Sequence, residues 1–205
     1  MNKTILTRED LKAFIAEDYR VQNINYPFFA RYTWGENWAL FSYMRNLRYI
    51  EYHLNKYKSS GTMLIMKLYH LTCYGFRYFR HRWKSKTLNI FISPNTVGPG
   101  FHMTHRGYRY ILDSVKIGSN CEILPMVLFG KRHPVPGPCR IVVGDNCYIS
   151  TGVTILGPVT IGDNVAIGAG AVVLNDLPDN CVAAGVPAKV VGENRIVGRI
   201  KNRIE

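Results

Sequence analysis

The chain has 205 residues, of which 47% are hydrophobic and 20% charged, a composition ordinary for a globular protein with a core of its own. Its five cysteines form no CxxC pair, which argues against a zinc site and a disulfide framework and is typical of a reducing cytoplasm. The net charge of +12 is concentrated in residues 1–90, with 15 Lys and Arg against 6 Asp and Glu. So basic a half would attract nucleic acid, an anionic membrane surface or an acidic substrate.

The first half of the chain predicts helices. Residues 1–20 contain acids and no apolar run, so we expect no signal peptide. From Asn37 to Tyr57 apolar residues recur at steps of three and four, which indicates a helix with one buried face. A Ser-Ser-Gly run ends it, and residues 62–80 indicate a second helix. We expect residues 1–88 to form a small, basic, aromatic-rich α-helical domain, and we expect no nucleic-acid partner because no nucleic-acid-binding fold is recognisable.

From residue 89 the period of the apolar residues changes to six. The three runs that keep this spacing are Phe91, Val97, Met103; Ile111, Ile117, Ile123, Phe129; and Val143, Ile149, Ile155, Ile161, Ile167, Val173. Such hexapeptide periodicity is the signature of a parallel β-helix, whereas sandwich strands are separated by longer and variable spacings. We expect a mainly β protein in which residues 89–192 form this helix with the aliphatic residues inside, followed by a basic tail at 193–205.

The period fails twice, each time by two extra residues. One break lies between Met103 and Ile111 and contains His105; the other lies between Phe129 and Val143 and contains His133. Loops that leave a rigid scaffold are where catalytic residues tend to be found. The two histidines are therefore candidate catalytic residues.

Four stretches of the second half resemble the hexapeptide-repeat acyltransferases, most closely the serine acetyltransferases. They are THRG at 104–107, RHP at 132–134, VGDNCYISTGVTILGPVTIGDNVAIGAGAVVLNDLP, and AAGVPAKVVG at 183–192. The resemblance covers about residues 90–192. It implies a left-handed β-helix assembled as a homotrimer, with acetyl-CoA as acyl donor in the cleft between neighbouring helices and no metal.

The resemblance also implies roles for single residues. His105 matches the general base, and His133 matches a second catalytic histidine contributed across the cleft. Thr104 and Arg132 match positions beside the acceptor. The positions that match the acetyl-CoA path are Gly130, Thr151, Ala169, Pro187 and Lys189.

The sequence departs from serine acetyltransferases around the acceptor. Thr104 stands where that family has an aspartate that helps hold the amino group of serine. The place of a second aspartate, which pairs with the imidazole, falls on Ile90 or Phe91. Asp113 and His102 remain candidates for a substitute partner of His105.

These departures favour a sugar over free serine. We expect an acetyl-CoA-dependent O-acetyltransferase that acts on a sugar hydroxyl, on a nucleotide-sugar or lipid-linked glycan, in bacterial capsular or surface polysaccharide synthesis. The alternatives are a serine O-acetyltransferase, then a sugar N-acetyltransferase, and, from another class, a non-catalytic β-helix assembly module. We expect a cytoplasmic location, and the basic first half suggests a peripheral contact with the inner face of the membrane.

Overall fold

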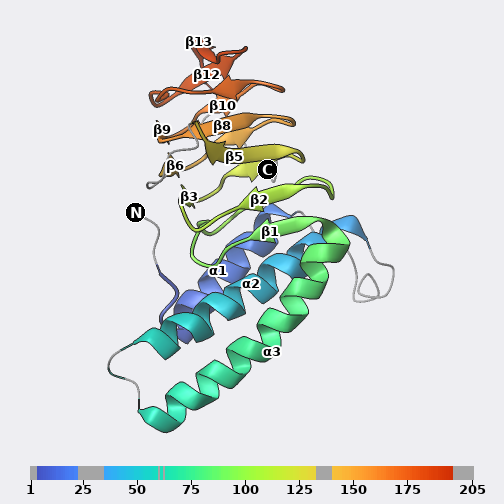
Figure 1. Cartoon of the computed structure of the whole chain (residues 1–205), viewed down its shortest axis with the longest axis vertical. Helices are drawn as coiled ribbons and strands as arrows, with labels where there is room; N and C mark the ends of the chain where they lie inside the picture. Colours follow the sequence, from blue (N-terminus) through green and yellow to red (C-terminus); the bar gives the residue numbers. More distant parts are fainter. Residues whose placement is uncertain (1–3, 23–34, 60, 62, 133–139, 196–205) are drawn as a thin grey trace.

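The computed structural model describes residues 4–22, 35–59, 61, 63–132 and 140–195. Three helices lie under a stack of short strands (Figure 1). They are α1 (Arg8–Val21), α2 (Glu36–Lys58) and α3 (Leu64–Leu88). Within the described residues, no helix is both long and apolar enough to cross a membrane.

Two of the helices differ from the sequence-based prediction. Within the helical domain expected over residues 1–88, no bounds were predicted for α1, which begins at a capping box: the Thr7 hydroxyl accepts the Asp10 N–H at 3.0 Å, and the Asp10 carboxylate accepts the Thr7 N–H at 2.9 Å. The helix predicted over 62–80 continues to Leu88, because no proline interrupts it. Asn89, at φ 56°, then ends it in the left-handed region.

The second half winds into a three-sided coil of short strands. The strands are β1 (Ile90–Ile92), β2 (Arg109–Ile111), β3 (Val115–Ile117), β4 (Glu122–Ile123), β5 (Val127–Lys131), β6 (Ile141–Val143), β7 (Tyr148–Ile149), β8 (Thr154–Gly157), β9 (Val159–Ile161), β10 (Ala166–Ile167), β11 (Val172–Val173), β12 (Cys181–Ala184) and β13 (Lys189–Glu193). Sheet A has the order β1-β2-β5-β8-β11, sheet B the order β3-β6-β9, and sheet C the order β13-β12-β10-β7-β4. All described pairings are parallel except that of β12 with β13, which turns back at the end of the stack.

The six-residue period places the core as predicted, with one exception. Every member of the second and third runs of aliphatic residues is buried, as are Val97 and Met103. Phe91 is half-buried, and its neighbours Ile90 and Ile92 point into the core instead. The prediction for Phe91 was wrong because side chains alternate along a strand, so a shift of one residue turns the side chain to the other face.

The Gly-Asp-Asn turns of successive coils pack so closely that only glycine fits at the first position of the turn. A Cβ atom on Gly144 would lie 2.7 Å from the backbone of Gly162 in the next coil. The Asp163 carboxylate accepts the N–H of Asp145 at 2.7 Å, and Asp179 does the same for Asp163 at 2.8 Å. The repeated turn is thus a hydrogen-bonded ladder that runs along the coil.

A buried guanidinium joins the helices to the first coil. Arg48 of α2 has no exposed surface and contacts the carboxylates of Asp18 and Glu51 at 2.8 and 3.0 Å. It also donates to the carbonyls of Val97 and Gly98 at 2.8 and 2.5 Å. Burial opposes the charge, but the two carboxylates outweigh it and raise the pKa of Arg48.

Substituting Arg48→Met should therefore destabilise the whole protein. Two buried carboxylates lose their counter-ion, and breaking a buried ion pair on one side costs about 3–5 kcal/mol. Urea denaturation monitored by circular dichroism would measure the loss. The exposed Lys12→Met on α1 is the control and should change the free energy of unfolding by less than about 0.5 kcal/mol. Equal stability of the two variants would contradict this account of the joint.

Candidate active site

His105 lies in a turn at one corner of the coil. His102 pairs with Glu122 of β4 in sheet C, and Arg109 begins β2 in sheet A, so residues 103–108 cross from one sheet to the other. His105 has φ 62°, a left-handed conformation that non-glycine residues seldom adopt. Its imidazole is largely exposed, with 69% of the side chain accessible. The fold thus holds a titratable side chain outward in an uncommon backbone conformation, which is typical of functional sites.

Arg109 fixes the backbone of this turn. Its guanidinium, 1% exposed, donates to the carbonyls of Thr104 at 2.6 Å, His105 at 3.0 Å and Ile123 at 3.0 Å. Burial lowers the pKa of Arg109 to about 10, so the group remains charged at neutral pH. The sequence pattern missed this residue, although Arg109 lies two residues before the inward-facing Ile111 and so shares its face of the strand, a signal that could have been noticed.

Glu36, the first residue of α2, orients the imidazole. Its Oε2 lies 3.3 Å from Nδ1 of His105, and its Oε1 accepts the N–H of Arg106 at 2.6 Å. The Arg106 N–H is the main cause that lowers the pKa of Glu36, and His105 adds to it. A carboxylate at Nδ1 favours the tautomer with the proton on that nitrogen, which leaves Nε2 able to accept one. The substitute partner of His105 is therefore Glu36 and not Asp113 or His102.

The Thr104 hydroxyl is hydrogen-bonded to a carboxylate of sheet C. It donates to Oε1 of the buried Glu122 at 2.7 Å, and Nδ1 of His102 lies 3.3 Å from the same oxygen. The three side chains form one cluster at the base of sheet C. The Thr104 hydroxyl, predicted to lie beside the acceptor, thus donates its hydrogen bond to Glu122 of the same chain. The role of Thr104 beside the acceptor stays a prediction.

Several predicted acetyl-CoA positions lie along the same corner as His105. We call it the C–A corner, the stack of turns at 104–108, 124–126, 150–153 and 168–171 that joins sheet C to sheet A. The turn at 185–188, between β12 and β13, caps this stack: Gly185 O accepts the Val172 N–H at 3.0 Å, and the Ala188 N–H donates to Val172 O at 2.8 Å. Met126 N–H bonds Tyr108 O at 2.8 Å, the Thr151 hydroxyl donates to Pro125 O at 2.8 Å, and Gly170 N–H bonds Thr151 O at 3.0 Å. Thr151, Ala169 and Pro187 therefore lie on one edge that rises from His105, and Lys189 begins β13 at its far end.

The remaining predicted positions lie at another corner. Gly130 pairs with Leu156 in sheet A, and Arg132 follows β5 where sheet A meets sheet B. The Arg132 guanidinium donates to Leu174 O at 3.3 Å. β5 has five residues and spans about 16 Å. Within one chain, His105 and Arg132 thus lie at opposite ends of the strands of sheet A. His133 lies outside the described residues.

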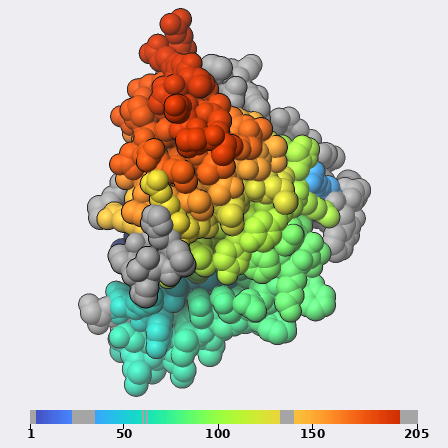
Figure 2. Space-filling model, turned by 45° about the horizontal axis from the view of Figure 1, so that its top comes forward, coloured from blue at the N-terminus to red at the C-terminus, as the bar shows by residue number. Residues whose placement is uncertain are grey.

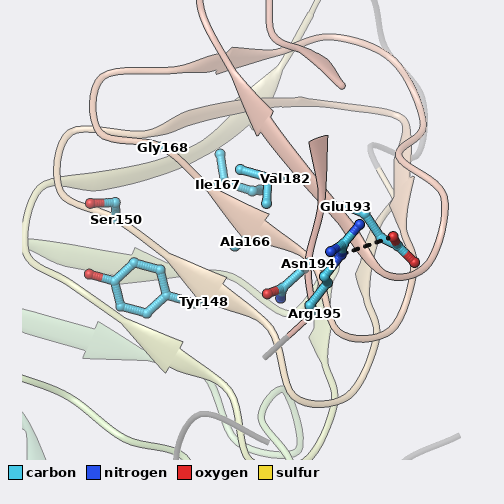
Figure 3. Close-up of a pocket in the computed structure, with 9 residues that line it drawn as sticks. All are labelled: Tyr148, Ser150, Ala166, Ile167, Gly168, Val182, Glu193, Asn194 and Arg195. Carbon is cyan, nitrogen blue, oxygen red and sulfur yellow. Dashed lines mark ion pairs between the residues drawn. The ribbon is translucent and has the colours of Figure 1, made fainter. Parts of the chain in front are cut away.

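A shallow hollow of about 380 Å³ opens on the outer face of sheet C, beside the C–A corner (Figure 3). Ala166 and Val182 give it apolar walls, and Ser150 and Gly168 directly precede Thr151 and Ala169. Asn194, at its edge, donates to Asn164 O at 2.9 Å. The hollow could hold an extended, mostly apolar chain. The described residues include no group of three or more His, Cys, Asp or Glu side chains arranged to bind a metal.

Comparison with known proteins finds similar proteins for the coil. The model for bacterial transferase hexapeptide repeats matches residues 140–175. A serine acetyltransferase of Bacillus subtilis is 34% identical over 122 residues, 57% of this chain and 56% of the relative. A galactoside O-acetyltransferase of Escherichia coli is 43% identical over 90 residues, 39% of this chain and 44% of the relative. The chain thus spans about half the length of the curated relatives it matches.

A solved structure extends the likeness beyond the coil. Soybean serine acetyltransferase complexed with serine superposes with a TM-score of 0.64 and 26% identity, and the match covers 88% of this chain and 69% of the soybean chain. The predicted fold, a left-handed parallel β-helix preceded by a small α-helical domain, is confirmed. By its repeat, its coil and these relatives, the chain is similar to the hexapeptide-repeat transferases, whose family model matches residues 140–175.

Proposed function

We propose that the chain is an acetyl-CoA-dependent O-acetyltransferase with His105 as its general base. The observation that carries the proposal is the contact between Nδ1 of His105 and Glu36. A β-helix that served only as an assembly module would have no use for a carboxylate-oriented imidazole exposed to solvent. The relatives that are named acetyltransferases support the reaction class.

The chemistry follows from the tautomer that Glu36 favours. Nε2 of His105 takes the proton of the acceptor hydroxyl while the hydroxyl oxygen attacks the thioester carbon. The carbonyl π electrons move to the oxygen, return as the C–S bond breaks, and the proton on Nε2 passes to the departing CoA thiolate. The products are an acetyl ester and CoA, and Glu36 stabilises the imidazolium that exists between the two transfers.

Acetyl-CoA would lie along the C–A corner. The proposal rests on Thr151, Ala169 and Pro187, which follow this edge from His105 toward β13. Lys189, exposed at the far end, would face the phosphates of CoA. The hollow on sheet C runs beside this path and would take the pantetheine arm.

Serine is the acceptor that the relatives favour over the sugar hydroxyl expected from the sequence. Serine acetyltransferases recur among both the relatives and the similar structures, including one complexed with serine. The sugar acceptor, with its role in polysaccharide synthesis, remains the second candidate because Thr104 replaces the expected aspartate and because the galactoside enzyme is also a relative.

The complete site would form between subunits of a homotrimer. His105 and Arg132 lie at different corners of one chain, so a neighbouring copy would bring its Arg132, and with it His133, to the first chain's His105. Tyr110 and Leu128 of sheet A and Leu112, which directly follows β2, are exposed, and such a neighbour would bury them. A cytoplasmic location is proposed on the free thiols of the four described cysteines, which a reducing compartment would preserve.

Release of CoA from acetyl-CoA, measured with serine, galactosides and nucleotide-sugars as acceptors, tests the function. We expect turnover with serine to exceed turnover with any sugar. His105→Gln should lower kcat by roughly 10²- to 10⁴-fold and leave the Kd of acetyl-CoA nearly unchanged, because a general base acts only in the transition state. A higher rate with a sugar than with serine would make the sugar the preferred acceptor. Activity that survives His105→Gln but not His133→Gln would move the base to His133.

The Glu36 contact should persist at all but acid pH. The pKa of Glu36 lies below its ordinary value of 4.5, so the contact is present above that pH and is lost as the pH falls through the lower, folded-state pKa. In ¹H–¹⁵N spectra recorded in the His105→Gln background, which removes the neighbouring imidazole, the amide proton of Arg106 should hold its position from neutral pH down to about 4.5 and shift only below it. In Glu36→Ala this step should be absent. A step of the same size in that variant, or one well above pH 4.5, would contradict the assignment.

A further inference from the structure

The helix α3 packs against the rest of the protein with its polar side. Its buried residues are His70, His81, Ser85 and Leu88, so only one of the four is aliphatic. His70 contacts His53 of α2 at 2.9 Å between the two Nδ1 atoms, and the His81 ring lies 4.3 Å from the ring of Tyr43. An amphipathic helix of a globular protein ordinarily turns its apolar stripe to the core. In α3 the arrangement is inverted.

The apolar stripe of α3 faces outward. It consists of Ile65, Leu68, Phe76, Phe79 and Trp83, which are 77%, 62%, 67%, 74% and 73% exposed. With the exposed Thr72 between Leu68 and Phe76, the steps along the helix are of three and four residues, so these side chains share one face. We call it the outer stripe. Figure 2 shows α3, in green, at the base of the molecule, away from the red end of the coil.

Cations accompany the outer stripe, and acids are absent from the helix. The 25 residues of α3 contain no Asp or Glu. Arg80, Arg82 and Lys86 are exposed next to Phe79 and Trp83. Lys84 donates to the Ser42 hydroxyl and so belongs to the packed side.

We propose that the outer stripe of α3 docks on an anionic lipid bilayer. The helix would lie along the surface, with Phe76, Phe79 and Trp83 entering the boundary between headgroups and acyl chains. Arg80, Arg82 and Lys86 would contact the lipid phosphates. Exposed aliphatic and aromatic residues combined with Lys and Arg are the composition of interfacial helices. Each cation near an anionic leaflet adds to the attraction, whereas the helix has no acid to oppose it.

The charge argues against a second copy of the chain as the occupant. Two outer stripes packed on each other would bring Arg80, Arg82 and Lys86 of both chains together, with no acid of α3 to neutralise them. The proposal does not depend on the acetyltransferase activity, because vesicle binding is measured without any substrate.

Sedimentation of the full chain with lipid vesicles tests the proposal. We expect the chain to sediment with vesicles of equal parts phosphatidylglycerol and phosphatidylcholine, and at least about tenfold more weakly with phosphatidylcholine alone. The double variant Phe79→Gln/Trp83→Gln should lose at least about tenfold in affinity, because the inserted apolar surface is removed. Arg80→Gln/Arg82→Gln should bind weakly and with less dependence on salt. Val191→Gln, which changes an exposed apolar residue on β13, is the matched control and should bind like the wild type.

Two results would overturn the proposal. One is equal sedimentation of the wild type with anionic and neutral vesicles, or of the wild type and Phe79→Gln/Trp83→Gln with anionic ones. The other comes from sedimentation velocity without lipid. If the wild type sediments with neither kind of vesicle and Phe79→Gln/Trp83→Gln lowers the mass of the assembly, the outer stripe is an interface between copies of the chain. Circular dichroism would confirm that the variants keep their helices.

Discussion

The buried guanidinium of Arg48 is the contact on which the geometry of the site depends. It ties α2 to α1 through Asp18 and to the first coil through the carbonyls of Val97 and Gly98. The Tyr43 hydroxyl adds a second tie, donating to Ile90 O and accepting from Ile92 N–H, both at 3.1 Å. Glu36 is twelve residues before Arg48 on the same helix, about 18 Å away along its axis. Because a helix is stiff over that length, the two ties determine where Glu36 meets His105.

This arrangement gives the three helices a second role besides closing the end of the coil. The turn at His105 is held from one side by Arg109 of the coil and from the other by Glu36 of α2. Neither half of the protein contains the complete site. A change in the position of α2 on the first coil would therefore alter the contact between Glu36 and the His105 imidazole before it disturbed the aliphatic core.

The coil could be predicted from the sequence because its period repeats one local rule. Each aliphatic residue at a spacing of six, followed by a Gly or Asn turn, fixes a rung without knowledge of any distant residue. The two breaks in the period likewise pointed to His105 and His133. The misplacement of Phe91 occurred in the first rung, where the coil meets α3 and no preceding rung sets the phase.

Glu36 could not be predicted, because its contact joins residues 69 apart across the two halves. No periodicity links a glutamate at the start of one helix to a turn in the coil. Arg48 was missed for the same reason, since in the sequence it is one more cation on a basic helix. The outward stripe of α3 was also hidden, because a pattern of three and four identifies an amphipathic helix and not the side that it buries.

A double-mutant cycle between Glu36 and His105 tests the central claim most directly. If Glu36 acts through the imidazole, Glu36→Gln should lower kcat/KM by at least about tenfold in the wild type and have almost no further effect on His105→Gln. The coupling would then be as large as the effect of Glu36→Gln itself. An equal fold loss in both backgrounds would contradict the account, because Glu36 would then act independently of His105.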